Sequence, residues 1–298
     1  MYRGAGQNDV QAICIFTVQV DERIDDAGRL LHGPALKLCT VKVGETVRGR
    51  KIGELFLRAA FQYATSHQCA HIFLHANATQ QDHLTSLLED FGFYRGGVYE
   101  GDAVFVKDHP VHAPAVPMPP FEYVRRYYPH YNSGIDVRKF IVPIQPRYHD
   151  ILFPDCTAPG RTLPANHPRQ HVGNAIKLAY LSNAPSNRPR PGDVVLFYRS
   201  RDQQAITTLG VVERYEAHTS AEQIAQLVSR RTVYSMIQIA DMAKRTTKVM
   251  LFRLIQNFEH PVTYNQLQRR LRVVRGHPQS ITEITDESFS RILRAADR

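Results

Sequence analysis

The chain has 298 residues, of which 43% are hydrophobic and 22% are charged, and these proportions are typical of a soluble globular protein of about two domains. It contains no run of 18 apolar residues and no apolar signal region near its start, so we expect a cytoplasmic protein that does not engage a membrane. Its four cysteines form no C-x-x-C pair, and its histidines do not cluster with carboxylates at metal-ligand spacings, so we expect neither disulfides nor a metal.

The net charge of +9 is distributed unevenly along the chain. Residues 1–110 hold 11 Lys+Arg against 13 Asp+Glu, a net charge of −2, whereas residues 111–298 hold 26 against 15, a net charge of +11. Of those 26 basic residues, 22 are arginine, the side chain that forks onto phosphates and stacks on bases. The second half therefore favours a nucleic-acid partner, and a basic surface that serves only solvation is the alternative.

The chain opens with two predicted strands. Residues 12–20 (AICIFTVQV) and 36–43 (LKLCTVKV) are mostly apolar or β-branched, and the acidic stretch 21–33 between them predicts a hairpin loop. From Ile52 onward, apolar residues recur at i, i+3, i+4, i+7, i+8 and i+11, which is typical of one face of a helix.

A basic turn, residues 48–53 (RGRKIG), joins the second strand to this helix. The first turn of a helix presents free N–H groups and the positive end of the dipole, and Arg48, Arg50 and Lys51 add full charges. We therefore predict a pyrophosphate site here. Neither G-x-x-x-x-G-K-[ST] nor G-x-G-x-x-G is present, so the NTPase and dinucleotide motifs do not explain it.

The next stretch predicts a strand, a helix and a hairpin. Residues 70–77 (AHIFLHAN) are a buried strand, and a helix follows with Thr79 as its N-cap and Gly92 at its end. Residues 94–99 and 103–107 would pair as a hairpin that turns at 100–102.

These pieces resemble the GNAT acetyltransferases. Arg48 and Gly53 match the ends of motif A, [RQ]-x-x-G-x-[GA], although Lys51 stands where the middle glycine is usual. Residues 87–93 (LLEDFGF) are similar to motif B, L-Y-x-x-x-G-F, with Leu88 in place of the tyrosine that protonates the departing thiolate. The resemblance implies an α/β fold with a mixed sheet and flanking helices over residues 1–108. It also implies acetyl-CoA as cosubstrate and an amine as acceptor.

The same resemblance implies functional residues. Backbone groups of Val41–Val43 would pair with the pantetheine arm, and a backbone N–H near Val43 would stabilise the oxyanion. Glu45 and His75 are the candidate bases, and Tyr94 is the candidate replacement for the missing tyrosine. The residues expected to bind the cofactor are Val41, Val43, Arg48, Gly49, Arg50, Lys51, Ile52 and Gly53.

One part of the expected fold is missing. The family opens with a strand and two helices that form much of the acceptor site, and these helices need roughly 30 residues. Only about a third of that length lies between the two predicted strands. Either an N-terminal part is missing, or another domain or a protein partner supplies the acceptor wall.

Residues 109–136 predict a linker. Five prolines occur within residues 109–120, a composition that favours extended, semi-rigid chain. The aromatic and basic residues 121–131 predict a short helix that Pro129 stops. Its tyrosines would either clasp the domains together or form a stacking surface for bases.

Residues 137–298 predict an α+β domain built on a small barrel. We expect a strand and a short helix after Lys139, a helix or strand over 173–181, and strands over 192–200, 205–215 and 249–255. Helices are expected over 219–245, 263–272 and 286–295, the last with Phe289, Ile292 and Leu293 facing inward.

This second pattern is similar to the PUA-like barrels of the ASCH and EVE families. The similar segments are 189–198 (PRPGDVVLFY), 210–213 (GVVE) and 278–281 (PQSI), while the ASCH signature G-x-K-x-x-E-x-R is not present as written. The resemblance implies binding of RNA or a modified nucleotide. The residues expected near the mouth of the barrel are Lys177, Arg199, Arg201 and Arg275.

Two functions therefore remain open. The first is a GNAT N-acetyltransferase that acts on an amine acceptor and carries an RNA-binding module. The second is a catalytically inactive CoA-binding and RNA-binding interaction protein of a toxin–antitoxin or defence system.

Overall fold

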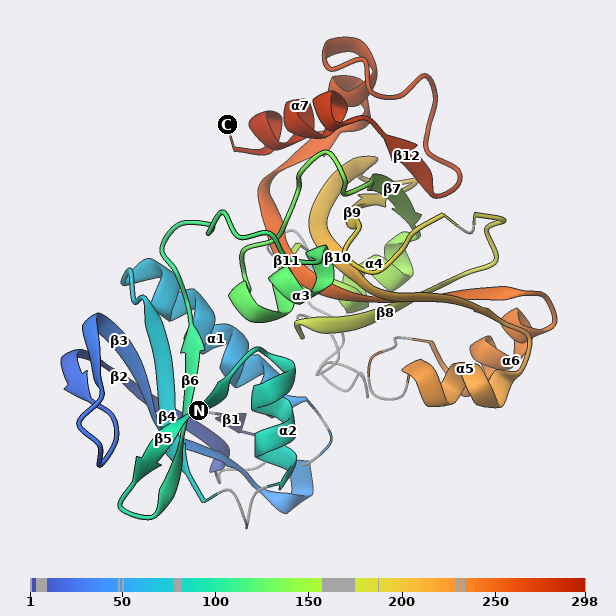
Figure 1. The fold of residues 1–298 in the computed structure, drawn as a ribbon. Helices are drawn as coiled ribbons and strands as arrows, with labels where there is room; N and C mark the ends of the chain where they lie inside the picture. The colour runs from blue at the N-terminus through green and yellow to red at the C-terminus, as the bar shows by residue number, and fades with distance from the viewer. Residues whose placement is uncertain are drawn as a thin grey trace. The chain divides into compact units, whose positions relative to one another are not determined.

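The computed structural model describes residues 2–3, 10–47, 49, 51–77, 82–156, 175–186, 188–228, 231 and 234–297. Its contacts divide the chain into two compact units, Met1–Tyr131 and Asn132–Arg298. Each unit is built on a mixed six-stranded sheet (Figure 1). No helix in the described ranges is long and apolar enough to cross a membrane.

The sheet of the first unit has the strand order β1-β2-β3-β4-β6-β5. Its strands are β1 (Tyr2–Arg3), β2 (Val10–Arg23), β3 (Leu30–Val43), β4 (His71–Ala76), β5 (Tyr94–Tyr99) and β6 (Asp102–Asp108). Its helices are the short η1 (Glu45–Val47), α1 (Ile52–Ser66), α2 (Asp82–Asp90) and α3 (Pro120–Tyr127). The strands and helices that the sequence predicts here are therefore present. The predicted N-cap, Thr79, lies outside the described residues.

The hairpin between β2 and β3 is longer than the sequence predicts, and its loop is correspondingly shorter. Strand pairing continues to Arg23 and Leu30, so only six residues are left for the loop. Two acidic side chains fold back onto the backbone around it: Asp25 Oδ1 accepts from Arg29 N at 2.8 Å, and Asp26 accepts from Glu100 N at 3.1 Å. The sequence predicted a loop of 13 residues, 21–33. The loop has six residues, and its acidic side chains hold it in place through these hydrogen bonds.

β3 and β4 run parallel for only a short distance. The pairing joins Ala35–Lys37 to His71–Phe73, and α1 forms the crossover between the two strands. Just beyond this pairing, β3 has a bulge at Cys39, because Ile15 pairs with Thr40 and Phe16 with Leu38. The bulge coincides with the point where pairing between β3 and β4 ends.

The linker helix α3 packs inside the first unit. Tyr123, Tyr127 and Tyr128 are each at most 8% exposed, and the ring of Tyr128 lies 5.5 Å from that of Phe61 on α1. The alternative that these rings form a stacking surface for bases is therefore wrong. They cover the first unit's own core.

Two further contacts hold α3 in place. Lys107 on β6 is fully buried, and its Nζ donates to the Arg126 carbonyl oxygen at 2.6 Å, at the negative end of the helix. A Cβ on Gly92, whose φ is +81°, would lie 2.4 Å from the Arg125 carbonyl oxygen. Gly92 thus ends α2 and also lets α3 approach its backbone.

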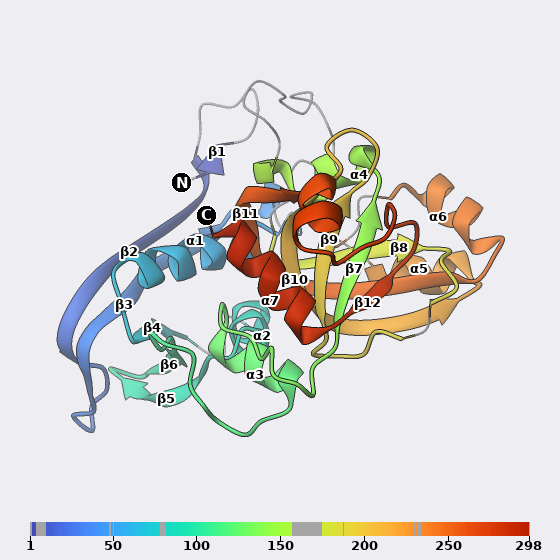
Figure 2. The ribbon, with the colours of Figure 1, turned by 90° about the horizontal axis from the view of Figure 1, so that it is seen from above.

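The sheet of the second unit has the order β12-β7-β9-β10-β11-β8. Its strands are β7 (Lys139–Ile144), β8 (Lys177–Ser182), β9 (Val194–Arg199), β10 (Ala205–His218), β11 (Thr247–Thr263) and β12 (Thr282–Ile284). Its helices are α4 (Pro146–Leu152), the short η2 (Pro154–Cys156), α5 (Ala221–Val228), α6 (Met236–Ala243), the π-helical turn η3 (Gln266–Arg270) and α7 (Asp286–Ala296). Figure 2 shows α7 beside the long strand β11.

One expectation for this unit was wrong, and one predicted helix has a different form. Among the described residues the edge strands β8 and β12 do not pair with each other, so the predicted barrel is an open sheet. The predicted helix over 263–272 is present over residues 264–270, although five of these seven residues form the π turn η3 and only Thr263 belongs to β11. Gln266 Oε1 accepts from Thr263 N at 2.8 Å at the start of this helical segment.

Candidate acetyl-CoA site and candidate nucleic-acid interface

The basic turn before α1 forms the start of the predicted pyrophosphate site. Gly49 and Lys51 both have left-handed backbone conformations, with φ of +78° and +59°, and the helix begins at Ile52. Lys51 Nζ lies 3.6 Å from Glu54 Oε2, with both side chains at most 9% exposed. The Lys51 charge is therefore directed partly at its own helix. Arg48 and Arg50 lie outside the described residues.

Ile52 and Gly53 position α1 rather than offer side chains to a ligand. Ile52 is buried with Ala12 and Val47. A Cβ on Gly53 would lie 3.2 Å from Leu87 on α2, so the glycine allows the two helices to approach closely. What these residues can offer an anion is their backbone N–H groups.

Strand β3 presents the predicted pantetheine-binding residues at its end. Val41 and Val43 are half-buried and pair with Cys14 and Ala12 on β2. Pairing with β4 has ended by Lys37, so the other edge of β3 at Val41–Val43 carries no strand among the described residues. Glu45 follows directly, exposed at the start of η1.

His75 is bound to the hairpin loop. Its Nε2 lies 3.1 Å from the Ile24 carbonyl oxygen, an acceptor, so Nε2 carries the proton. Its ring stacks on Tyr99 with centroids 4.7 Å apart. Burial, followed by the charge of Lys37, lowers the His75 pKa. Only Nδ1 is left for a base role.

Tyr94 lies at the opposite end of β4 from Ala76. Its hydroxyl donates to Asp108 Oδ1 at 3.3 Å and accepts from Arg29 at 3.2 Å, and Asp108 pairs with His71, where β4 begins. Leu88, which stands at the usual tyrosine position, is fully buried. The roles of Glu45, His75 and Tyr94 in catalysis stay predictions.

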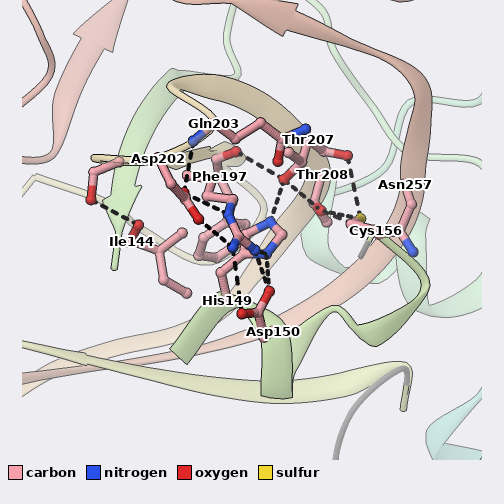
Figure 3. A network of polar contacts seen from close by, with 12 residues as sticks. Ile144, His149, Asp150, Cys156, Phe197, Asp202, Gln203, Thr207, Thr208 and Asn257 are labelled. Carbon is pink, nitrogen blue, oxygen red and sulfur yellow. Dashed lines mark hydrogen bonds and ion pairs between the residues drawn. The ribbon is translucent and has the colours of Figure 1, made fainter. Parts of the chain in front are cut away.

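In the second unit, Arg199 belongs to a buried polar network with His149, Asp150 and Asp202, and Figure 3 labels these three partners. Its side chain is 4% exposed, and it donates from Nε and NH2 to Asp202 at 2.8 and 2.7 Å. NH1 forms an ion pair with Asp150 and donates to His149 Nδ1 at 3.0 Å. The hydrogen bonds to Asp202 and Asp150 raise the Arg199 pKa. Because this guanidinium already contacts Asp202, Asp150 and His149, we do not include Arg199 among the candidate RNA-binding residues.

The same network fixes the proton on His149. Because arginine can only donate, Nδ1 must accept, and the neutral ring then carries its proton on Nε2, 2.7 Å from Thr207 Oγ1. Burial lowers the His149 pKa and keeps the ring neutral. His149 therefore donates to Thr207 and does not activate it as a nucleophile.

A bulge in β10 builds the rest of this network. Ile206 pairs with Tyr198 and Thr208 with Phe197, so Thr207 is the extra residue. The two hydroxyls thus lie 3.2 Å apart in the interior, and Thr208 also contacts Cys156 at 3.4 Å and Asn257 at 3.2 Å. Sequence reasoning missed these residues. The one available signal was the polar pair inside an otherwise apolar strand.

Lys177 belongs to a second cluster. Its Nζ lies 3.7 Å from Glu213 Oε1, and Arg231 and Arg253 lie 3.0 and 3.6 Å from the same carboxylate. Glu213 is the extra residue of another bulge in β10. Burial opposes its charge, but these three cations outweigh burial and lower the Glu213 pKa. Lys177 is thus separated from the other predicted RNA contacts.

Arg201 and Arg275 lie at one end of the unit. Gln204 links them: its side chain donates to the Arg201 carbonyl oxygen at 3.1 Å, and its own carbonyl accepts from Tyr264 N at 2.7 Å. The Tyr264 ring stacks on His277, two residues after Arg275. Three more exposed arginines lie at the end of η3 and in the loop that follows it. We define the arginine rim as Arg201, Arg269, Arg270, Arg272 and Arg275.

The rim arginines differ from Arg199 in both exposure and pairing. All five are exposed, and within the described ranges none forms an ion pair with a carboxylate. Sequence reasoning identified two of them and missed the three that η3 and the following loop present.

Comparisons with known proteins concern mainly the second unit. Residues 180–295 match the EVE domain. A search of curated proteins found no match. The match supports the predicted EVE and PUA-like character of the second unit. The strands of that unit form an open sheet rather than a closed barrel.

Three solved structures show partial likeness. ASCH from Zymomonas mobilis is 15% identical, with 52% of this chain and 94% of that chain covered at a TM-score of 0.40. Rpa0253 from Rhodopseudomonas palustris is 14% identical, with 54% and 94% covered at 0.33. The NatC complex bound to Gag peptide and CoA is 16% identical, with 34% and 62% covered at 0.28. All three TM-scores lie below 0.5, so none of these likenesses bears on the function of this chain.

Among the described side chains, no three histidine, cysteine, aspartate or glutamate residues form a group that would hold a metal ion.

Proposed function

We propose that the second unit binds RNA through the arginine rim. The observation that carries this proposal is that five exposed arginines without carboxylate partners gather at one end of a unit whose residues 180–295 match the EVE domain. A guanidinium presents a planar fork of donors that matches phosphate oxygens, and it is weakly hydrated. Exposed arginines that form no ion pairs with carboxylates contribute a local positive field that attracts a polyanion.

Counterion release provides the test. Each phosphate neutralised on a single strand contributes about −0.7 to the slope of log K against log salt. Fluorescence anisotropy with a labelled RNA oligonucleotide, from low to moderate potassium chloride, measures that slope. The double variant Arg201→Gln, Arg275→Gln should make the slope shallower by about 1.4 if each residue contacts one phosphate.

Arg214→Gln is the matched control. Arg214 is exposed in the same unit but forms an ion pair with Glu216, so we expect wild-type affinity and slope. If the wild-type chain shows no RNA binding at low salt, where attraction to phosphate is greatest, the proposed function is wrong.

The second candidate function is acetyl transfer from acetyl-CoA in the first unit. What supports it is the short parallel pairing of β3 and β4, which ends at Lys37 beside the bulge at Cys39, together with a helix whose N-terminus follows a basic turn. The open edge at Val41–Val43 would pair with the pantetheine amides. The helix start would hold the pyrophosphate through its N–H groups.

The reaction needs an uncharged acceptor amine at the thioester. Its nitrogen attacks the carbonyl carbon, the new N–C bond forms, and a backbone N–H near Val43 stabilises the oxyanion. Collapse breaks the C–S bond, the amine proton leaves to a base, and the CoA thiolate takes up a proton. The base would be Glu45 or Nδ1 of His75. Tyr94, which bonds to Asp108 and Arg29, would have to reorient to supply the second proton.

Calorimetry and a turnover assay separate the active from the inactive alternative. CoA binding together with acetylation of an amine supports a transferase. Binding without turnover supports the interaction protein of a toxin–antitoxin or defence system. No CoA binding by the full chain would refute both forms of this candidate.

A further inference from the structure

Residues close to the arginine rim in the chain form an aromatic pair that the proposed RNA binding does not yet use. The rings of Tyr264 and His277 stack with centroids 3.6 Å apart and planes inclined by 21°. Tyr264 is half-buried, whereas His277 is exposed. Tyr264 therefore supports the imidazole from the protein side and leaves the His277 ring accessible to solvent.

A third ring fixes the position of His277. The Tyr198 hydroxyl lies 3.1 Å from His277 Nδ1, and Tyr198 itself is 1% exposed. Burial raises the pKa of Tyr198 to about 12, so this hydroxyl keeps its proton at physiological pH. Stacked on one ring and hydrogen-bonded to another, His277 is an exposed side chain with little rotational freedom left to lose on binding.

Two rim arginines belong to the segments that adjoin this pair. Arg275 lies two residues before His277, and the Arg201 turn reaches Tyr264 through Gln204. A fixed, exposed aromatic ring near exposed arginines can bind a base by stacking while the backbone phosphates contact guanidinium groups. A duplex cannot use it, because its bases are already stacked on each other.

We propose that Tyr264 and His277 form a stacking platform that receives an unpaired base, so that the rim selects single-stranded over double-stranded polynucleotide. This inference rests on the proposed RNA binding. It adds that the ligand is single-stranded and that the His277 ring contacts an unpaired base. The ligand chemistry is an unpaired nucleobase flanked by phosphates, which both RNA and DNA single strands provide.

The first experiment uses the wild-type chain and changes only the ligand. Binding of a single-stranded oligouridine is compared with an abasic oligonucleotide of the same length and charge, with oligothymidine, and with an RNA duplex. Stacking predicts that the base-bearing strands bind about five- to hundredfold more tightly than the abasic strand. The oligothymidine arm separates DNA from RNA. Equal affinity for the base-bearing and abasic strands would overturn the proposal.

The second experiment changes the platform. His277→Ala should weaken single-strand binding about five- to hundredfold, leave duplex affinity unchanged and leave the salt slope unchanged, because the arginines remain. His277→Phe keeps a ring and should restore most of the binding. His112→Ala, at another exposed histidine in the proline-rich linker, is the control and should bind as wild type.

The outcomes distinguish this inference from the function on which it rests. If His277→Ala does not change RNA binding, or weakens single-strand and duplex binding equally, the stacking platform is wrong. RNA binding through the arginine rim would still stand. Complete absence of wild-type binding at low salt overturns both. Melting temperatures of the variants show whether a loss of binding reflects unfolding, and in that case the wild-type comparison with the abasic strand decides.

Discussion

Arg199 and Arg201 are two residues apart and should behave in opposite ways. Arg199 is 4% exposed and bonds to Asp202, Asp150 and His149, whereas Arg201 is exposed in the turn between β9 and β10. We therefore expect Arg199→Ala to reduce the stability of the second unit without a specific effect on RNA. Arg201→Ala should do the reverse.

The magnitude depends on the groups that Arg199→Ala leaves behind. Breaking a buried ion pair by removing one partner costs about 3–5 kcal/mol, because a desolvated charge remains. The Asp150 and Asp202 side chains are 21% and 38% exposed, so water can reach both carboxylates. We therefore expect the lower end, a loss of about 3 kcal/mol in the free energy of unfolding. For Arg201→Ala we expect less than about 0.5 kcal/mol.

Urea unfolding of the full chain, followed by circular dichroism, measures this loss. Because the chain has two units, two transitions are expected, and only one should shift in Arg199→Ala. The unshifted transition is an internal control. RNA binding is then measured under conditions where both variants are folded, and only Arg201→Ala should change the salt slope. Unchanged stability of Arg199→Ala together with a shallower slope would refute this assignment.

The remaining predictions concern the first unit. Burial, then the charges of Lys107 and His130, lower the pKa of His109 to about 4, so the folded state resists its protonation. Stability should therefore fall as pH drops below about 6.5 and level off near 4. Between pH 7.5 and 5 wild type should lose about 2 kcal/mol more than His109→Gln, and equal losses would contradict the assignment. Arg48→Ala with Arg50→Ala should weaken CoA binding by about 1.5–3 kcal/mol per lost charge-assisted bond, and equal calorimetric affinities would remove the site. If Tyr94 protonates the thiolate, Tyr94→Phe should slow acetyl transfer; an unchanged rate would leave water as the proton source.

Local patterns in the sequence predicted most elements well. The helix that begins at Ile52 was located from its apolar period, because α1 buries one face. The predicted face is only partly the buried one: Ala59 and Tyr63 are exposed, whereas Leu57, Phe61 and Ala64 are buried. The turn at residues 100–102 was equally clear between two apolar strands. In both cases the information lies within a few residues of the element itself.

Features that depend on pairing partners were not predictable in this way. Two bulges of β10, at Thr207 and Glu213, break the alternation of its side chains, and Thr207 and Thr208 are both buried, so alternation along the strand does not identify its buried face. The closure of the predicted barrel depends on whether two edge strands meet, and no local signal specifies that.

The candidate interface shows the same limit. Arg199 and Arg201 occupy one short segment (YRSRD), and nothing in it tells which guanidinium faces carboxylates from α4 and the following turn. The net charge of each half of the sequence showed that the second unit is basic, but it did not show which arginines are exposed and without ion pairs. Separating the two arginines required the positions of Asp150 and Asp202.

The packing of α3 has a consequence for where the chain can be divided. The resemblance placed the end of the first domain at residue 108, yet Tyr123, Tyr127 and Tyr128 complete a core that lies mostly before that point. A fragment ending at residue 108 would expose Phe61 and remove the carbonyl group to which Lys107 donates. The proline-rich segment therefore leads the chain back to the core of the first unit. A fragment meant to contain that whole unit should end near Tyr131.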